Sequence, residues 1–432
     1  MQSDVLNEDI WAMILNFTRL DGARKQSLVT RSIHSLARRV VLSSARLFTQ
    51  FQLVKACNFM LDDPDHCACW LCELYVQPYA LADLKDGHTA EAVSALVQLA
   101  GLLEAAQNIQ TLSLPYMEVL VVAEPRIGTA LISLTRLQDV ELLGVSSHVL
   151  DVANQMVSRP SRVSLGFVSP LAGISEHIVQ LSHLTLLENA RRVNIVFSDA
   201  DDADEFKQPS DFDFELAQLG QYPSVRELCL YLCGPLPIFH IFPNMQILRM
   251  RRLNASFRRF DWRTWAWTGS VPLIKADAPN NDNRVQRTPY RMGRLPTGPL
   301  PDMLTSWVES LLPVIRQSRL VCMKLRFDVG NPPLKVTGLN AVREMLARQL
   351  QVPSLRYICI DAGWHQLERG PFDSHDYQRL FLVTKCTWCQ VRDVGGERCV
   401  GIISCKAGER VERYLCSAEF EKTLSLDGVV LT

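Results

Sequence analysis

The stretch Pro223-Ser224-Val225-Arg226-Glu227-Leu228-Cys229-Leu230 sets the pattern from which the fold of this 432-residue chain can be predicted. It contains a hexad of the form apolar-x-x-apolar-x-apolar, and a close copy returns at Pro353-Ser354-Leu355-Arg356-Tyr357-Ile358-Cys359-Ile360. Apolar residues at i and i+2 share one face of a strand, so each hexad predicts a short buried strand. Complete copies occur at Ile109/Leu112/Leu114, Leu137/Val140/Leu142, Ala190/Val193/Ile195, Val225/Leu228/Leu230, Met245/Leu248/Met250, Leu320/Met323/Leu325 and Leu355/Ile358/Ile360. A further copy at Val163/Leu165 lacks its first apolar residue.

Helix-like stretches separate these copies. The clearest is 90–107, where one face is predicted to carry Val93, Leu96, Val97, Ala100 and Leu103. Strand, loop and helix recurring every ~20 to 40 residues is typical of a leucine-rich-repeat-like solenoid. We therefore expect an α/β fold with an irregular solenoid over residues 46–378. The alternative is an ordinary α/β domain whose strands happen to share this register.

The first forty residues predict short amphipathic helices instead. Asn7 can cap a helix in which Ile10, Met13, Ile14 and Phe17 repeat at helical spacing. A break at 19–22 leads to a second helix that ends near Leu28-Val29, and the helical period continues at Ile33, Leu36, Ala37, Val40 and Val41. Helices this short need a partner or the rest of the chain to bury their apolar faces.

These residues resemble an F-box. Residues 6–15 and 28–33 match the two halves of that motif, with Asn7, Thr30 and Ile33 off its pattern. The repeats behind them resemble those of fungal F-box proteins with degenerate leucine-rich repeats. The resemblance implies a substrate-recruiting subunit of a ubiquitin ligase, joined through a Skp-type adaptor to a cullin and a RING subunit. It assigns the adaptor contacts to Leu6, Ile10, Ile14, Leu28, Val29 and Ile33. The alternative is a plain helical cap over residues 1–45, which would make the protein a non-ligase interaction scaffold.

Two cysteine clusters raise the question of a metal site. His66, Cys67, Cys69 and Cys72 have spacings found in zinc sites, but Cys69, Cys72 and Leu74 also fit the hexad register of an additional first repeat. Cys386 and Cys389 lie in a strand-like run before the turn signal Gly395-Gly396, so residues 379–432 predict a β-hairpin plus a helix. Residues three apart in a strand face opposite sides. We therefore expect no metal and no cofactor.

One segment breaks the repeat and is a candidate for specificity. Residues 254–300 combine arginines with tryptophans, and the candidate substrate-binding residues are Arg258, Arg259, Trp262, Trp265 and Trp267. Such side chains can anchor a protein or stack on single-stranded nucleic acid, although the tryptophans can equally pack inward. The acidic run at 199–205 lacks the glycine and glutamate of a calcium loop and is interpreted as a solvated loop.

Composition narrows the function class further. The formal net charge is -1, from 45 basic and 46 acidic residues, which argues against global attraction to nucleic acid or anionic membranes. An acidic start, no apolar run of about 20 residues and 13 scattered cysteines favour a cytoplasmic or nuclear protein without a membrane span. Phosphate-binding, hydrolase-elbow, metalloprotease and dinucleotide motifs are missing from the sequence, so we expect no enzymatic activity.

Overall fold

The chain forms a mixed α/β structure in which most strands are parallel. A computed structural model describes residues 31–62, 67–81, 90–167, 174–197, 219–231, 237–252, 319–328, 352–369, 378–394 and 397–423. The chain divides into two compact units, residues 1–198 and 199–432. The boundary expected at residue 45 falls inside the first unit, and that expected at residue 378 falls inside the second.

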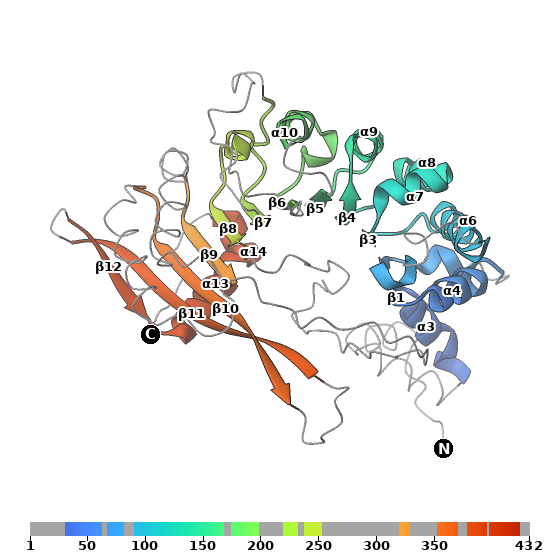
Figure 1. Ribbon diagram of the computed structural model, residues 1–432, viewed down its shortest axis with the longest axis horizontal. Coiled ribbons are helices and arrows are strands. Elements are labelled where there is room, and N and C mark those ends of the chain that lie inside the picture. The colour runs from blue at the N-terminus through green and yellow to red at the C-terminus, as the bar shows by residue number, and fades with distance from the viewer. Residues whose placement is uncertain are drawn as a thin grey trace, which may run out of the picture. The chain divides into compact units, whose positions relative to one another are not determined.

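The first unit contains a row of parallel strands that follow one another in chain order (Figure 1). The strands are β1 (Ser44–Leu47), β2 (Glu73–Val76), β3 (Thr111–Leu114), β4 (Asp139–Val145), β5 (Arg162–Phe167) and β6 (Arg192–Phe197). The α-helices are α3 (Arg31–Leu42), α4 (Gln50–Asp62), α6 (Ala90–Ala105), α7 (Met117–Ala123), α8 (Pro125–Ser133), α9 (Ser147–Gln155) and α10 (Ile174–Ser182). Three short 3-10 helices lie at Cys67–Trp70, Pro78–Leu81 and Thr185–Leu187. Figure 1 shows α6, α8, α9 and α10 along one side of the strand row.

The predicted hexads place their apolar residues in register. Leu112, Val140, Val163 and Val193 are paired from strand to strand, and all four are buried. Leu114, Leu142, Leu165 and Ile195 form the next buried row. Aligned short strands bury a continuous apolar core because each strand covers its neighbour's edge and shares its face. The strands expected at the hexads are confirmed.

The second unit continues the pattern and then changes direction. Its strands are β7 (Glu227–Tyr231), β8 (Ile247–Arg252), β9 (Cys322–Asp328), β10 (Tyr357–Arg369), β11 (Gln378–Val394) and β12 (Glu397–Ile403). Strands β7 to β10 are parallel, whereas β10, β11 and β12 pair antiparallel. A 3-10 helix spans Pro237–Ile241, and two helices close the unit, α13 (Cys405–Leu415) and α14 (Ala418–Thr423). The hairpin expected around Gly395-Gly396 is present as β11 and β12, which pair from Trp388↔Ile403 to Val394↔Glu397.

The sheet of the second unit is buried on both faces. The hexad face carries a buried row through Leu228, Leu248, Met323 and Ile358. The opposite face packs against α13 and α14, in a cluster formed by Ile247, Cys322, Tyr357, Cys359, Trp388, Val411, Leu415 and Phe420. This two-sided burial explains why Tyr357-Ile358-Cys359-Ile360 is apolar at every position.

Two details of the sequence interpretation are wrong. Leu74 pairs with Leu112, so the hexad here is Leu71/Leu74/Val76. The register Cys69/Cys72/Leu74 begins two residues too early, and Cys72 occupies an x position of the hexad. A shift of two residues preserves strand alternation, and the cysteines therefore satisfied the pattern equally well. In α6, Val93 and Val97 are exposed, because the helix turns Ala92, Ala95 and Leu99 inward beside Leu96 and Leu103.

The structure also contains a repeat strand that the pattern did not predict. Ala45 and Leu47 of β1 are buried and pair with Leu74 and Val76 of β2. An alanine at the central position weakens the apolar signal of this copy. No helix among the described residues is long and apolar enough to cross a membrane.

Candidate functional site

The face of the first unit's strands opposite the hexads is lined by polar and charged side chains. These occupy the x positions of the hexads, because alternate residues of a strand face opposite sides. Most of their contacts join residues that are directly paired on neighbouring strands, as for Ser44 and Glu73 or Ser164 and Asn194. We call this surface the polar strand face.

Cross-strand contacts organise the polar strand face. The Ser44 hydroxyl donates to Glu73 at 2.9 Å, the Ser113 hydroxyl donates to Glu141 at 2.5 Å, and the Asn194 amide donates to Ser164 at 2.9 Å. The Arg46 guanidinium lies 4.9 Å from the centre of the Tyr75 ring, and Arg162 is 3.4 Å from Asp139. Each of these pairs matches donor with acceptor or cation with anion or ring, so the face is polar but locally neutralised.

Burial shifts the pKa values of two groups on this face, Asp139 and Tyr75. Partial burial raises the pKa of Asp139 above its ordinary value, and Arg162 opposes this rise only in part. The pKa of the Tyr75 phenol is raised by burial and by Glu73, with Arg46 acting in the opposite direction.

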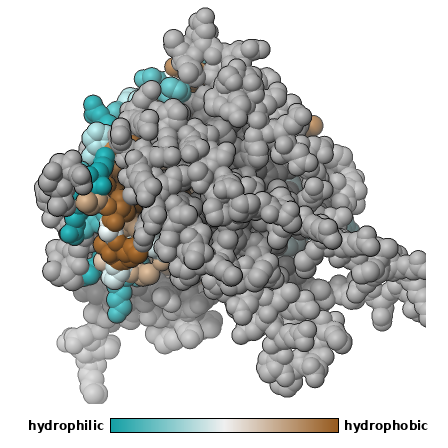
Figure 2. All heavy atoms as spheres, turned by 60° about the vertical axis from the view of Figure 1, so that its left-hand side comes forward, coloured by the Kyte–Doolittle hydropathy of each residue, from teal (hydrophilic) through white to brown (hydrophobic). Residues whose placement is uncertain are grey.

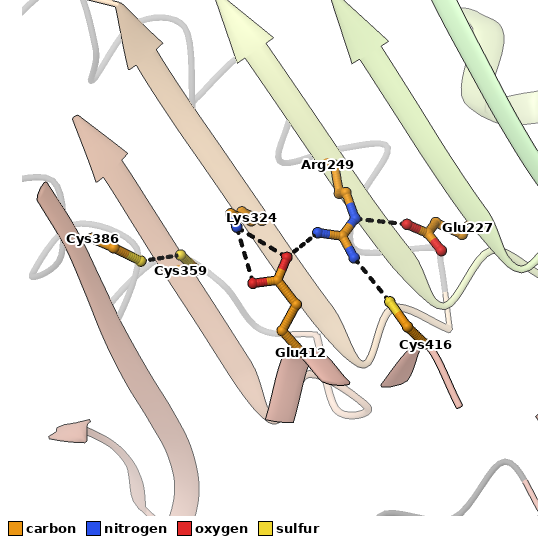
Figure 3. A network of polar contacts seen from close by, with 7 residues as sticks. All are labelled: Glu227, Arg249, Lys324, Cys359, Cys386, Glu412 and Cys416. Atoms are coloured by element: carbon orange, nitrogen blue, oxygen red, sulfur yellow. Dashed lines mark hydrogen bonds and ion pairs between the residues drawn. The ribbon is translucent and has the colours of Figure 1, made fainter. Parts of the chain in front are cut away.

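In the second unit the corresponding face carries a charged network beneath α13. Figure 3 shows Glu412 of α13 pointing between Arg249 of β8 and Lys324 of β9, with Glu227 of β7 on the far side of Arg249. Arg249 and Lys324 occupy paired positions on neighbouring strands. Two cations next to each other on a sheet repel, so a shared anion between them is stabilising.

The distances within this network are those of charge-assisted hydrogen bonds. Lys324 Nζ lies 3.0 and 3.1 Å from the two carboxylate oxygens of Glu412. Arg249 Nε lies 2.6 Å from Glu227 Oε1, and Arg249 Nη1 donates to Glu412. Arg249 Nη2 is 3.4 Å from the sulfur of Cys416. The two cations and two anions balance, and every charge in the network has at least one partner.

Mutual attraction in this network outweighs the cost of burial. Burial disfavours the Glu412 carboxylate, but Arg249 and Lys324 together hold its pKa below the ordinary value. Burial likewise opposes the Lys324 ammonium, and Glu412 nevertheless raises its pKa. Arg249 is held charged by Glu227 and Glu412 against the same penalty. The network therefore remains ionised at neutral pH and fastens α13 to the sheet.

Helix α13 is built to dock on this face. The Ser404 hydroxyl accepts from the Ala407 amide at 3.2 Å and caps its first turn. Ala407, Gly408, Val411 and Leu415 form its buried stripe at helical spacing. Gly408 lies against the Trp388 ring so closely that a Cβ there would be 2.1 Å from Cγ of the ring. The glycine thus permits a close approach between helix and strand.

Most site residues expected from the sequence lie outside the described residues. This holds for Leu6, Ile10, Ile14, Leu28 and Val29, and for Arg258, Arg259, Trp262, Trp265 and Trp267. Ile33 lies in α3, although its side chain is not among those described. The acidic run at 199–205 and His66 also fall outside.

Sequence reasoning missed the network, since it did not single out Arg249 and Lys324, which occupy x positions of the hexads. A signal was available: β9 carries Cys322 and β10 carries Tyr357 and Cys359 at the x positions, which indicates that something covers this face. That the cover is α13 could not be deduced, because Glu412 is 163 residues from Arg249 along the chain.

Within the described ranges no three or more His, Cys, Asp or Glu side chains are grouped so that they could hold a metal ion. Comparisons with protein-family models and with curated proteins find no match for this chain.

The side of the molecule that carries β9 to β12 in Figure 1 comes forward in Figure 2, where apolar residues gather between hydrophilic ones. Among the described large apolar side chains of the second unit, Ile402 of β12 is the exposed one, at 60%.

Proposed function

We propose that this protein is a substrate-recruiting subunit of a Skp/cullin/F-box-type ubiquitin ligase, in which a leucine-rich-repeat-like array holds a protein target. The observation that carries the proposal is the row of in-register hexad strands that begins at β1, directly behind the F-box-like sequence. Its mechanism is proximity: the array holds the target while another subunit of the ligase positions the activated ubiquitin.

The N-terminal part of the proposal is supported by α3. The described helix Arg31–Leu42 includes the last residues of the F-box-like motif, 31–33. Ala37 is buried with Val40 and Val41 packed against it, which gives the helix one apolar face. In this proposal that face joins the helical module to the first repeat, and Ile33 remains a predicted adaptor contact.

The target-binding part is supported by the polar strand face. Its exposed and half-buried side chains carry donors, acceptors and both charge signs, which suits a polypeptide partner better than a small apolar ligand. These side chains are Ser44, Arg46, Glu73, Asp139 and Arg162, whereas Ser113, Ser164 and Asn194 are buried. The residues from Arg258 to Trp267 remain a predicted contribution to the same recognition. Single-stranded nucleic acid is the less favoured partner, because the contacts on the polar strand face involve acids as well as bases.

A pull-down with the full-length chain and a purified Skp-type adaptor tests the first step. Charged substitutions at Ile10 and Ile14 should abolish adaptor capture while leaving circular dichroism and melting temperature unchanged. Val122→Asp is the matched control, because it adds a charge at a side chain that is 64% exposed. Failure of the unaltered chain to capture the adaptor would reject the ligase role.

The same experiment separates the second candidate, a non-ligase interaction scaffold. Asn7, Thr30 and Ile33 depart from the F-box pattern, which favours a helical cap. If the N-terminal helices only cap the core, substitution of Ile10 and Ile14 by charged residues will unfold the chain rather than selectively remove the adaptor.

Removal of a charge on the polar strand face tests target binding. Arg162→Ala should weaken capture of a target identified by co-purification, because Arg162 is exposed on this face. Arg126→Ala is the control, since Arg126 lies on α8 and pairs with Glu104 of α6 at the surface. Alanine substitution of the arginines and tryptophans between Arg258 and Trp267 tests the insertion separately.

A further inference from the structure

Two thiols meet on the face of the sheet next to the charged network. The sulfur atoms of Cys359 on β10 and Cys386 on β11 are 3.0 Å apart. Figure 3 shows the two side chains pointing toward each other. Cys359 is fully buried, whereas Cys386 is partly exposed. Two carbon atoms in contact are ~3.5 to 4.0 Å apart, and two sulfur atoms that are not bonded to each other ordinarily lie farther apart than that. This separation is shorter than an ordinary contact between unbonded atoms, and either sulfur can act as the hydrogen-bond donor.

The surroundings give the two sulfurs different roles. Hydrogen bonding from Cys359 lowers the pKa of Cys386, an effect supported by the positive charge of Lys324 and opposed by burial, Asp361 and Glu412. The same hydrogen bond, together with burial, raises the pKa of Cys359. Cys359 is paired directly with Lys324 on β9. Cys386 is therefore the more accessible of the two sulfurs and the one that deprotonates more readily, whereas Cys359 is the buried thiol held against it.

We propose that Cys359 and Cys386 form a reversible redox site that hydroperoxides oxidise to a disulfide. Cys386, once deprotonated, attacks the terminal oxygen of the hydroperoxide and the O–O bond breaks. Cys386 sulfenic acid forms, and hydroxide leaves from hydrogen peroxide or alkoxide from an alkyl hydroperoxide. The Cys359 sulfur then attacks the Cys386 sulfur and gives up its proton. The S–O bond breaks, the S–S bond forms and water leaves. Overall two thiols lose two electrons and one hydroperoxide is reduced.

The strand register makes this disulfide a labile one. Cys359 is opposite Trp388 and Cys386 is opposite Asp361, so the two cysteines are diagonal neighbours rather than a direct pair. Diagonal positions are typically ~7 to 8 Å apart, near the upper limit of ~7 Å between the Cα atoms of a disulfide. Closing the bond requires β10 and β11 to shift, and the strained product is readily reduced by a dithiol.

Two other cysteines could compete and must be distinguished. Cys405, at the start of α13, is exposed, and its sulfur lies 3.4 Å from the backbone oxygen of Cys386. Cys389 is close in sequence but buried on the hexad face beside Ile358, its partner across the strands. Neither sulfur approaches Cys359 in the way that Cys386 does.

Peptide mapping of the full-length chain tests the proposal. The reduced protein is treated with an equimolar amount of hydrogen peroxide, capped with N-ethylmaleimide and digested with trypsin without reductant. Cleavage after Arg356 and Lys385 yields peptides 357–369 and 386–392. The expected product is these two peptides joined by a disulfide, which a dithiol reductant separates again.

Variants assign the bond to its two sulfurs. Cys386→Ser should remove the linked product, whereas Cys389→Ser and Cys405→Ser should retain it. Recovery of 357–369 only in its maleimide-capped form, or its linkage to a peptide containing Cys405, would overturn the proposal. Mapping of the unaltered chain decides the question even if a variant fails to fold.

Discussion

The contact between Gly408 and Trp388 allows a sharp test of how α13 docks. Gly408→Ala would place a Cβ 2.1, 2.2 and 2.5 Å from three carbon atoms of the Trp388 ring. Ordinary contacts between carbon atoms are ~3.5 to 4.0 Å, so the ring or the helix must move by more than an ångström. Trp388 is buried at the centre of the cluster formed with Cys359, Val411 and Leu415, and it has little room to do so.

Two opposing effects determine how much Gly408→Ala changes the free energy of unfolding. Alanine favours a helix interior over glycine by ~1 kcal/mol, which by itself would make Gly408→Ala stabilising. Overpacking a filled core costs about 1 to 3 kcal/mol, and the upper end applies here because the clash involves the ring root rather than a flexible tip. We expect a net loss of roughly 2 kcal/mol in the free energy of unfolding.

Urea unfolding and amide hydrogen exchange of residues 405–415 provide the measurement, because exchange reports α13 separately from the rest of the chain. Gly401→Ala in β12 is the matched control, since a Cβ there meets nothing within 4 Å. Trp388→Leu should reduce the cost of the alanine at 408 when the two changes are combined. A Gly408→Ala protein that is as stable as the unaltered chain would refute the docking of α13 against this strand.

Three further predictions follow from other parts of the structure. Leu165→Ala on β5 should cost about 2 to 5 kcal/mol in chemical denaturation, because the side chain is fully buried, while Arg162→Ala should change stability by ~0.5 kcal/mol or less. Gly144→Ala should lower the melting temperature, because Gly144 has a φ of 79° and a Cβ there would be 3.0 Å from the Tyr116 backbone. Glu412→Gln should cost about 1 to 3 kcal/mol at pH 7, since it leaves two half-buried cations without their shared anion. The Glu412 carboxyl has a lowered pKa in the folded state, so its contribution is present above the unfolded value of 4.5 and is lost as the pH falls through the folded value. Denaturation curves of Glu412→Gln and unaltered protein should therefore converge in acid and stay apart at neutral pH.

The strands could be predicted because the hexad combines two kinds of information. Apolar residues at i and i+2 specify a buried strand face, and a third apolar residue three positions earlier marks the turn that leads into the strand. Ile109, Leu137 and Val225 are all buried at that first position. At Val163 the position is taken by Pro160, which is also buried, so the incomplete copy still forms a strand.

The hexad pattern failed at two strands. At β2 two registers fit the pattern equally well, and at β1 the central residue is the small Ala45. Cys69, Cys72 and Leu74 have the same spacing as Leu71, Leu74 and Val76, and periodicity alone cannot choose between two registers that differ by two. Burial decides the matter: Leu71 is fully buried, whereas Cys69 and Cys72 are only partly so. The Cys-x-x-Cys spacing drew attention away from the leucine.

The charged network could not be predicted, because it depends on contacts that are distant in sequence. Periodicity predicts α13 as an amphipathic helix but does not indicate which surface receives it. Glu412 lies beside the buried stripe of the helix, and nothing in the segment 405–415 indicates that its partners are Arg249 and Lys324. Pairing of distant charges requires the tertiary fold.

The contrast between the two strand faces determines where target binding is best tested. In the second unit the face opposite the hexads is covered by α13, so a substitution at Arg249 would disturb both the helix and any bound partner. Loss of binding there could not be separated from loss of structure. In the first unit Arg162 is exposed, and its contact among the described residues is the cross-strand one with Asp139, so its charge can be removed at small cost to stability. Reduced target capture by Arg162→Ala, in a chain that melts at the same temperature, would therefore identify the polar strand face as a binding surface.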